Sequence, residues 1–173
     1  MANAAALIAE RTPIPEARAR SGDESLYLAG LFHDVGLLVL ARHYPGEYEA
    51  ARGAALPAGR SLPEAERALH GSDHSDLGAP LVASWGLPEV TVAAIAAHHD
   101  LERVAPEQRW AGHVLHLAEA VALSAGFPDL DEGVASNWDG ASQRVLGLSP
   151  DALDQLIEAT QLAAHRDRLL LVA

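Results

Sequence analysis

Apolar residues along the chain recur at spacings of three and four positions, and no segment shows the strict alternation that is typical of a strand. A serine followed three residues later by a glutamate, at Ser21 and again at Ser61, predicts two helix starts by the capping-box pattern. Prolines and other capping residues predict the remaining starts. The predicted helices cover residues 3–10, 21–42, 47–55, 61–69, 73–85, 88–99, 106–126 and 139–146, with a last helix after Ser149-Pro150 and a loop at 127–137. The sequence therefore predicts an all-α fold, a bundle of about seven to nine helices.

Composition narrows the class of protein. The chain has 173 residues, of which 49% are hydrophobic, and this suffices for one domain with a buried core. Because cysteine is absent, disulfides, cysteine-ligated metal sites and thiol catalysis are excluded. No apolar run approaches the ~18–20 residues of a membrane span, and the first residues do not form a signal peptide pattern. We therefore expect a cytoplasmic protein that does not bind membranes.

Charge and histidine content further restrict the functions that the chain can have. The chain has 24 acidic and 12 basic residues, all of the latter arginine, which gives a formal net charge of −12. Without a basic cluster, binding to nucleic acid is not expected. The absence of lysine also removes P-loop and Schiff-base chemistry. Nine histidines in such a chain are the unusual feature, and their positions carry the functional argument.

Histidines and carboxylates interrupt helices that are otherwise apolar. His33 and Asp34 lie in the middle of the predicted helix 21–42, whose faces are almost all hydrophobic. His98 and His99 end a helix on its apolar side. A buried aspartate is rare unless it is paired or binds a metal. A hydrogen-bonded core remains the alternative interpretation at each of these positions.

Polar side chains also occur in two further predicted helices. Glu119 and His116 are the strongly polar side chains between positions 114 and 125, and His74 lies in the first turn of its helix. Imidazole and carboxylate together are ligands for Zn, Mn, Fe and Ni. If these helices converge, the sequence predicts a buried polar centre, which holds a divalent metal or is simply hydrogen-bonded.

The ordered set of motifs resembles a known family. Residues 31–36, with His33 and Asp34, resemble the His-Asp motif of HD-superfamily domains. Residues 73–78, 85–88 and 95–99 are similar in order and spacing to HDOD domains, the HD-related output modules of bacterial signalling proteins. Residues 116–120 correspond to the late helix in which the family usually has an aspartate, here Glu119. The resemblance covers about residues 24–126, and residues 146–149 with the following helix are similar to the end of the family's fold.

The resemblance implies an organisation for the whole chain. Residues 21–126 would form the HD-like core, and residues 127–173 would complete the same domain with a loop and C-terminal helices. Residues 1–20 would be an N-terminal helix and proline-rich turn, the remnant of an N-terminal half that the chain lacks.

The resemblance also implies a ligand set. The residues that would bind metal are His33, Asp34, His74, His98, His99 and Glu119. His113 and His116 would lie next to these ligands without binding the metal themselves. Three departures argue against catalysis. Leu37 stands where HD-GYP phosphodiesterases have lysine, Asp100 begins a run that lacks their Gly-Tyr-Pro motif, and the first helix, residues 3–10, offers no histidine.

Two functions of different class follow. The first is a signalling domain that binds signalling proteins or associates with itself, as a homo-oligomer, without catalytic turnover. The alternative is a metal-dependent phosphohydrolase that acts on a nucleotide or cyclic dinucleotide, with Asp34 as a catalytic residue. Metal binding in a structural or sensory role is compatible with the first. In either case we expect His98 and Glu119 to lie within reach of His33 and Asp34.

Overall fold

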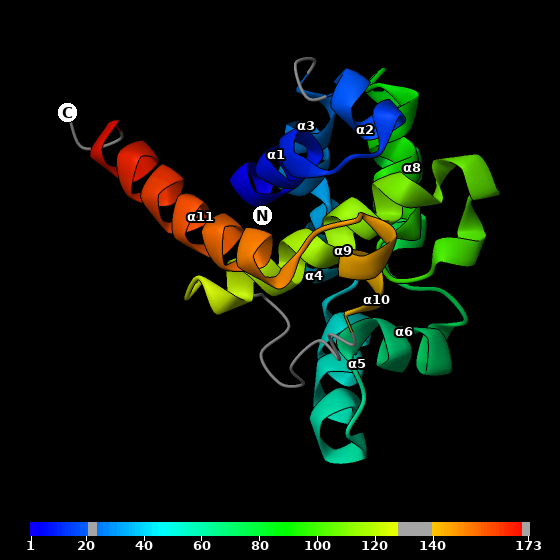
Figure 1. Ribbon diagram of the computed structural model, residues 1–173. Coiled ribbons are helices and arrows are strands. Elements are labelled where there is room, and N and C mark those ends of the chain that lie inside the picture. Colours follow the sequence, from blue (N-terminus) through cyan, green and yellow to red (C-terminus); the bar gives the residue numbers. More distant parts are fainter. Residues whose placement is uncertain (21–23, 128–139, 171–173) are drawn as a thin grey trace.

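The computed structural model describes residues 1–20, 24–127 and 140–170 (Figure 1). These residues form helices, turns and loops without a strand, which confirms the predicted all-α fold. The helices are α1 (Ala2–Arg11), α2 (Pro15–Arg20), α3 (Ser25–Phe32), α4 (Val35–His43), α5 (Pro45–Ala58), α6 (Leu62–His70), α7 (His74–Ser84), α8 (Glu89–Ala97), α9 (Arg109–Ser124), α10 (Ala141–Val145) and α11 (Pro150–Leu170), with short 3-10 helices η1 (Leu101–Arg103) and η2 (Pro106–Gln108).

The continuous helix predicted over residues 21–42 is wrong in one respect. The chain breaks it at His33 and Asp34, which form a two-residue turn between α3 and α4. Asp34 leaves the helical conformation, with φ −99° and ψ 15°, and its carbonyl accepts the N–H of Leu37 at 2.9 Å. The apolar periodicity continues across the turn, so the pattern gives no sign of it. The predicted capping box at Ser21 and most of the predicted loop at 127–137 lie outside the described residues.

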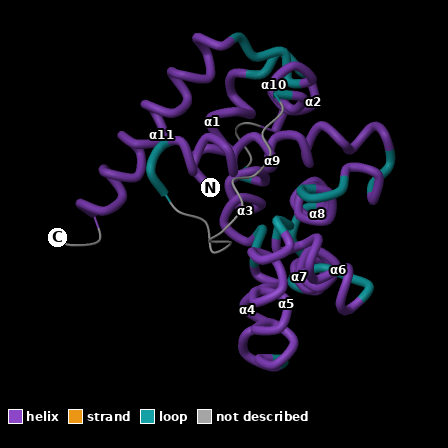
Figure 2. The backbone as a smooth tube through the Cα atoms, turned by 90° about the horizontal axis from the view of Figure 1, so that it is seen from below, coloured by secondary structure: helices purple, strands orange, loops and turns teal. Residues whose placement is uncertain are grey.

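The main core is built around α9. This helix packs against α1, α3, α8, α10 and α11, so the core joins the first described helix to the last (Figures 1 and 2). Its largest buried side chains have at most 1% of their surface exposed, and they include Ile8, Leu26, Ile95, Leu115 and Leu156. Alanines fill much of the remaining core, which lets the helices approach closely.

A glycine sets the crossing of α4 and α7. A Cβ atom added to Gly36 would lie 2.0 Å from the carbonyl oxygen of His74, far inside any contact distance. Gly78 faces the same crossing, where its own added Cβ would lie 3.4 Å from the backbone nitrogen of Gly36. Because the two backbones touch, the turn that contains Asp34 lies directly beside the start of α7.

Helices α5 and α6 form a hairpin at one end of the molecule, away from α11 (Figures 1 and 2). The hairpin has a small hydrophobic cluster of its own, formed by Leu37 of α4, Ala51 and Leu62, with Tyr48 packed against it. Helix α6 packs on α5, and α5 packs on α4. The predicted capping box of Ser61 and Glu64 is confirmed at the start of α6.

Residues Ser25–His43 together are long and apolar enough to pass a test for a membrane-spanning helix. The segment is broken by the turn at Asp34, and α3 packs on α1 and α8 while α4 packs on α7. Core helices of a folded domain pass the same test, so the segment is poor evidence for a membrane span.

Candidate metal centre

Four side chains from three parts of the chain meet at the crossing of α4, α7 and α8. Asp34 precedes α4, His74 is the first residue of α7, and His98 and His99 follow the end of α8. One ligand atom from each residue lies within 4.8 Å of those of the other three. The structure thus brings together Asp34 of the His-Asp motif, His74 and the histidine pair.

The distances inside this group are short. Oδ1 of Asp34 lies 3.4 Å from Nε2 of His74 and 4.0 Å from Nε2 of His98. Nε2 of His99 lies 2.9 Å from Nε2 of His74. The rings of His98 and His99 have centroids 3.8 Å apart. Three imidazole nitrogens and one carboxylate oxygen therefore face a common point.

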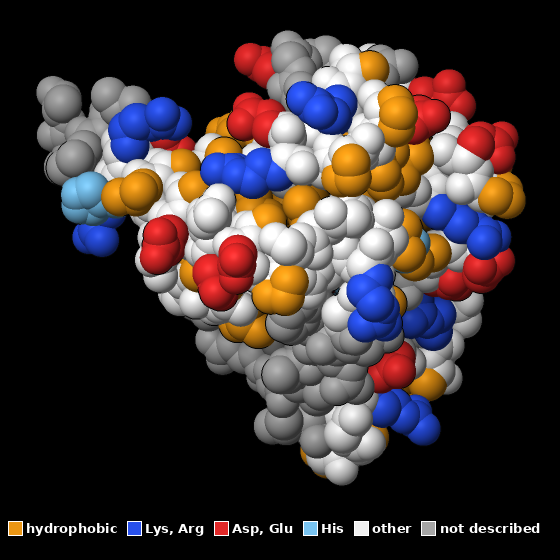
Figure 3. Space-filling view, in the orientation of Figure 1, with side chains coloured by type: hydrophobic (Ala, Val, Ile, Leu, Met, Phe, Trp, Pro, Cys, Tyr) orange, Lys and Arg blue, Asp and Glu red, His pale blue; other side chains and the backbone are white. Residues whose placement is uncertain are grey.

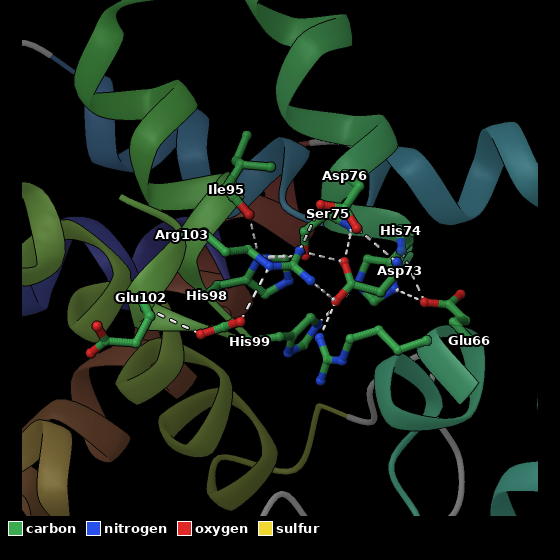
Figure 4. Close-up of polar contacts among 12 residues, drawn as sticks. Glu66, Asp73, His74, Ser75, Asp76, Ile95, His98, His99, Glu102 and Arg103 are labelled. Carbon is green, nitrogen blue, oxygen red and sulfur yellow. Dashed lines mark hydrogen bonds and ion pairs between the residues drawn. The ribbon is translucent and has the colours of Figure 1, made fainter. Parts of the chain in front are cut away.

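His98 provides the clearest sign that this point suits a cation. Its Nδ1 donates a hydrogen bond to the carbonyl oxygen of Ile95 at 2.7 Å (Figure 4), so in the neutral ring Nε2 carries the free lone pair. That Nε2 is buried and has no hydrogen-bond partner in the described structure. Burial, together with the charges of His74 and His33, lowers the pKa of His98 to about 3, and burial likewise holds the pKa of His99 well below its usual range. Both rings are therefore neutral at pH 7, as metal ligation requires.

His74 is held from both sides. Its Nδ1 lies 2.8 Å from Oε2 of Glu66, and its Nε2 faces Asp34. Burial would lower the pKa of His74, but hydrogen bonds to the Asp34 and Glu66 carboxylates outweigh it and raise the pKa to about 10. Without a metal, His74 is thus the cation that balances the carboxylates of the centre.

Asp34 is an ionised carboxylate. Burial would raise its pKa, but contacts with His33 and His74 outweigh burial and hold the pKa well below its usual range. Its Oδ2 lies 2.9 Å from Nε2 of His33, and Nδ1 of His33 donates to the carbonyl oxygen of Gly30 at 3.1 Å. His33 therefore lies beside the Asp34 carboxylate without belonging to the group of four.

A second ionic cluster anchors the start of α7. The side chain of Asp73 caps this helix by accepting the N–H of Ser75 at 2.9 Å. Arg103 binds the same carboxylate through two nitrogens, at 2.9 and 3.0 Å (Figure 4). Arg67 of α6 also contacts it. Burial would raise the pKa of Asp73, but the paired arginines lower it. The cluster ties η1, which follows His99, to the helix that carries His74.

The remaining predicted site residues lie outside the group of four. His33 is in contact with Asp34, and its ring centroid is 5.7 Å from that of His98. Glu119 is buried in α9 but is not one of the four converging residues. Nδ1 of His116 lies 3.4 Å from the carbonyl oxygen of His98, so His116 reaches the backbone of a ligand residue. His113 points to α10, with its Nδ1 3.0 Å from Oγ of Ser142.

Sequence reasoning missed Glu66 and Arg103. Glu66 occupies the buried stripe of α6, four residues after Leu62 and one after Ala65, and it has 1% of its surface exposed. A charged residue on an apolar stripe is the signal that identified Asp34, and it could have identified Glu66 as well. Arg103 gives no such local signal, because its partner Asp73 lies 30 residues away in the sequence.

The donor set fits a divalent transition metal. Three imidazole nitrogens and one carboxylate oxygen suit zinc, manganese, iron or nickel better than magnesium or calcium. The buried, unpartnered Nε2 of His98 is the atom that such an ion would satisfy. The residues that would hold the ion are Asp34, His74, His98 and His99.

Comparison with known proteins identifies the family and the fold. A family model described as the HDOD domain matches residues 1–101. A protein of Marinobacter aquaeolei VT8, described as a signal transduction protein, has a fold that matches 92% of this chain and 34% of its own, with 22% identity and a TM-score of 0.70. The MmoQ response regulator of Methylococcus capsulatus strain Bath matches 91% of this chain and 57% of its own, with 28% identity and a TM-score of 0.57.

A curated relative adds a sequence match. An uncharacterized protein of Treponema pallidum (strain Nichols) is 31% identical over 94 residues, which are 51% of this chain and 18% of that protein. The chain thus spans less than two thirds of each of these three proteins. The family model covers more than half of the chain and includes Asp34, His74, His98 and His99. The chain belongs to the HDOD domain family.

Proposed function

We propose that the chain is a regulatory domain of signal transduction that binds one divalent metal ion and acts through contacts with other proteins, without catalytic turnover. One observation carries the metal site. The ligand atoms of Asp34, His74, His98 and His99 lie within 4.8 Å of one another, around a buried nitrogen of His98 that has no partner. Membership of the HDOD family and the likeness to a response regulator support the signalling setting.

The chemistry of the site favours a structural or sensory metal over a catalytic one. If all four residues bound one ion, a four-coordinate site would have no open position, which is typical of structural zinc, whereas catalytic sites keep a position open for water or substrate. A phosphate substrate also needs cationic side chains or metal ions that balance its negative charge. The chain has no lysine, and Arg67 and Arg103, which lie beside the start of α7, are both paired with Asp73.

Exposed apolar side chains support a role in protein contacts. Leu31 and Leu38, on α3 and α4, expose 54% and 63% of their surface, and Trp85 exposes 51% while its ring packs edge-on against Phe32. Elsewhere, the face in Figure 3 intersperses arginine and acidic side chains and shows no broad basic patch. This mixed charge favours a protein partner over nucleic acid.

A metal-dependent phosphohydrolase is the second candidate, and the exposure of Asp34 favours it. Its side chain is 14% exposed, so solvent can reach one edge of the centre. In such an enzyme a bound metal activates water and polarises phosphoryl oxygens.

Two measurements test the proposal. Protein purified without an affinity tag should contain about one equivalent of metal, and Asp34→Ala and His98→Ala should lose it. The wild-type protein should hydrolyse neither cyclic dinucleotides nor nucleotide monophosphates, with or without added manganese or iron. Robust turnover that Asp34→Ala abolishes would replace the proposal with the phosphohydrolase. Analytical ultracentrifugation of the isolated protein tests for self-association. Leu38→Ser, which removes an exposed apolar side chain from α4, should weaken this association.

A further inference from the structure

Glu66 is a buried carboxylate that lies next to the metal centre without belonging to the group of four. It lies on α6 and has 1% of its surface exposed. Its Oε2 accepts two hydrogen bonds from His74, one from the backbone N–H at 2.9 Å and one from Nδ1 at 2.8 Å (Figure 4). Its Oε1 is buried without a partner in the described structure. Glu66 therefore directs its carboxylate at a single residue.

The two bonds fix the position of His74, and when a bound metal keeps the ring neutral they also match the tautomer with the proton on Nδ1. An ionised carboxylate only accepts hydrogen bonds, so Nδ1 of His74 must carry the proton in this contact. The other ring nitrogen, Nε2, then points to Oδ1 of Asp34 and to Nε2 of His99. A carboxylate behind a ligating histidine orients the ring and makes it a stronger ligand.

Glu66 also connects two parts of the fold. The α5–α6 hairpin has its own small hydrophobic cluster, separate from the main core, and it meets the bundle through the packing of α5 on α4. From α6, Glu66 reaches His74 and Arg67 reaches Asp73, so the start of α7 is bound to the hairpin by charged side chains.

We propose that Glu66 is the positioning residue of the metal centre and that it couples metal occupancy to the docking of the α5–α6 hairpin. The inference rests on the proposed metal binding. If Glu66 improves His74 as a ligand, then by thermodynamic linkage a bound metal stabilises the contact between Glu66 and His74 by the same factor. The stability of the docked hairpin would then depend on whether the centre binds a metal ion.

Metal affinity tests the positioning role. Chelator-treated protein is titrated with Zn²⁺ against a chromophoric competitor. Glu66→Gln keeps the size and an acceptor oxygen but removes the charge, and Glu66→Met removes the acceptor as well. We expect affinity to fall about tenfold in Glu66→Gln and towards about a hundredfold in Glu66→Met. Glu64→Gln is the matched control, because Glu64 is exposed on the same helix and glutamine also serves in a capping box.

Two further readouts separate positioning from simple packing. In the Zn²⁺-loaded protein, the Nδ1–H proton of His74 should give a downfield, slowly exchanging NMR signal in the wild type, and this signal should move upfield or be lost to exchange in Glu66→Met. Hydrogen exchange should slow across residues 45–70 when Zn²⁺ binds the wild type, and this effect should be lost in Glu66→Met. Glu66→Gln, which can keep the bond to the His74 backbone, provides the test if Glu66→Met does not fold.

The outcomes distinguish this inference from the proposed function. If the wild type binds no Zn²⁺, the metal proposal and this inference both fail. If the wild type binds Zn²⁺ and Asp34→Ala does not, while the Glu66 variants bind it with wild-type affinity and hairpin protection, then the centre stands and the role of Glu66 is refuted.

Discussion

Gly36→Ala should damage the metal centre without changing any ligand side chain. The added methyl group would lie 2.0 Å from the carbonyl oxygen of His74 and 2.8 Å from its carbonyl carbon. Even tight Cβ contacts lie at 3.0–3.4 Å, so α4 and α7 must separate by about 1.0–1.4 Å. The obstacle is backbone of a capped helix, which cannot rotate away as a side chain end would.

The magnitude follows from opposing effects. Overpacking of this kind costs about 1–3 kcal/mol, and replacing glycine by alanine within a helix returns up to about 1 kcal/mol. Because the clash here is with backbone, we expect the upper part of that range and a net loss of about 2 kcal/mol. For a chain of this length the melting temperature should fall by about 4–8 °C. Since Asp34 and His74 move apart, the affinity for Zn²⁺ should fall by at least about tenfold.

The same substitution elsewhere in the chain provides the control. An added Cβ at Gly53, which is exposed on α5, meets nothing within 4 Å. Gly53→Ala should therefore keep the metal affinity and raise stability by up to about 1 kcal/mol. Differential scanning calorimetry and Zn²⁺ titration of both variants provide the comparison. If Gly36→Ala melts at or above the wild-type temperature and binds Zn²⁺ as tightly, the account of the α4–α7 crossing is wrong.

Three further predictions concern charge and metal. Zn²⁺ at a hundredfold excess over its dissociation constant should stabilise chelator-treated protein by about 2.7 kcal/mol, and Asp34→Ala should remove the effect in a thermal melt. Metal-free protein should be most stable near the unperturbed histidine pKa, about 6.5. The folded pKa of His74 is raised to about 10, so its contribution to stability is lost as pH rises above 6.5. The folded pKa of His98 is lowered to about 3, so its contribution is lost as pH falls below 6.5. A denaturation series that is flat between pH 5 and 9 would refute this. Asp73→Asn keeps the helix cap but loses the ion pairs with Arg103, and it should lower the free energy of unfolding by about 2 kcal/mol in urea titrations.

Local patterns predicted most helix boundaries, because capping is a local interaction. The start of α6 follows from Ser61 and Glu64, and the start of α7 follows from Asp73, whose side chain accepts a backbone N–H as its position predicts. The break between α3 and α4 was not predictable in this way. A two-residue turn leaves the apolar periodicity almost unchanged, so the sequence pattern does not reveal it. The break lies where α7 packs against Gly36, a contact between residues far apart in the chain.

The site was predictable only in part, for a related reason. Asp34, His98 and His99 were found because each is polar in an apolar stretch, and the family resemblance supplied the ligand role of all four residues, His74 included. That signal identifies buried polar residues but does not rank them by distance, so it also selects Glu119, which lies outside the group of four. Which buried residues share a centre depends on helix crossings, and these are set by contacts between residues far apart in the chain.

The charges of the centre favour a divalent ion and predict how its binding depends on pH. Among the four ligands and Glu66, the metal-free centre holds two carboxylates and one imidazolium, because the pKa of His74 is raised to about 10. A ligating imidazole is neutral, so metal binding at Nε2 releases the proton of His74. A divalent ion then balances Asp34 and Glu66, whereas a monovalent or trivalent ion would leave a buried net charge, which is unfavourable. Since one proton is released, the affinity for Zn²⁺ should rise by up to about tenfold per pH unit between pH 7 and 8.5. Calorimetry in buffers of different ionisation enthalpy measures the released proton directly, and an affinity that is independent of pH would show that His74 is neutral before the metal binds.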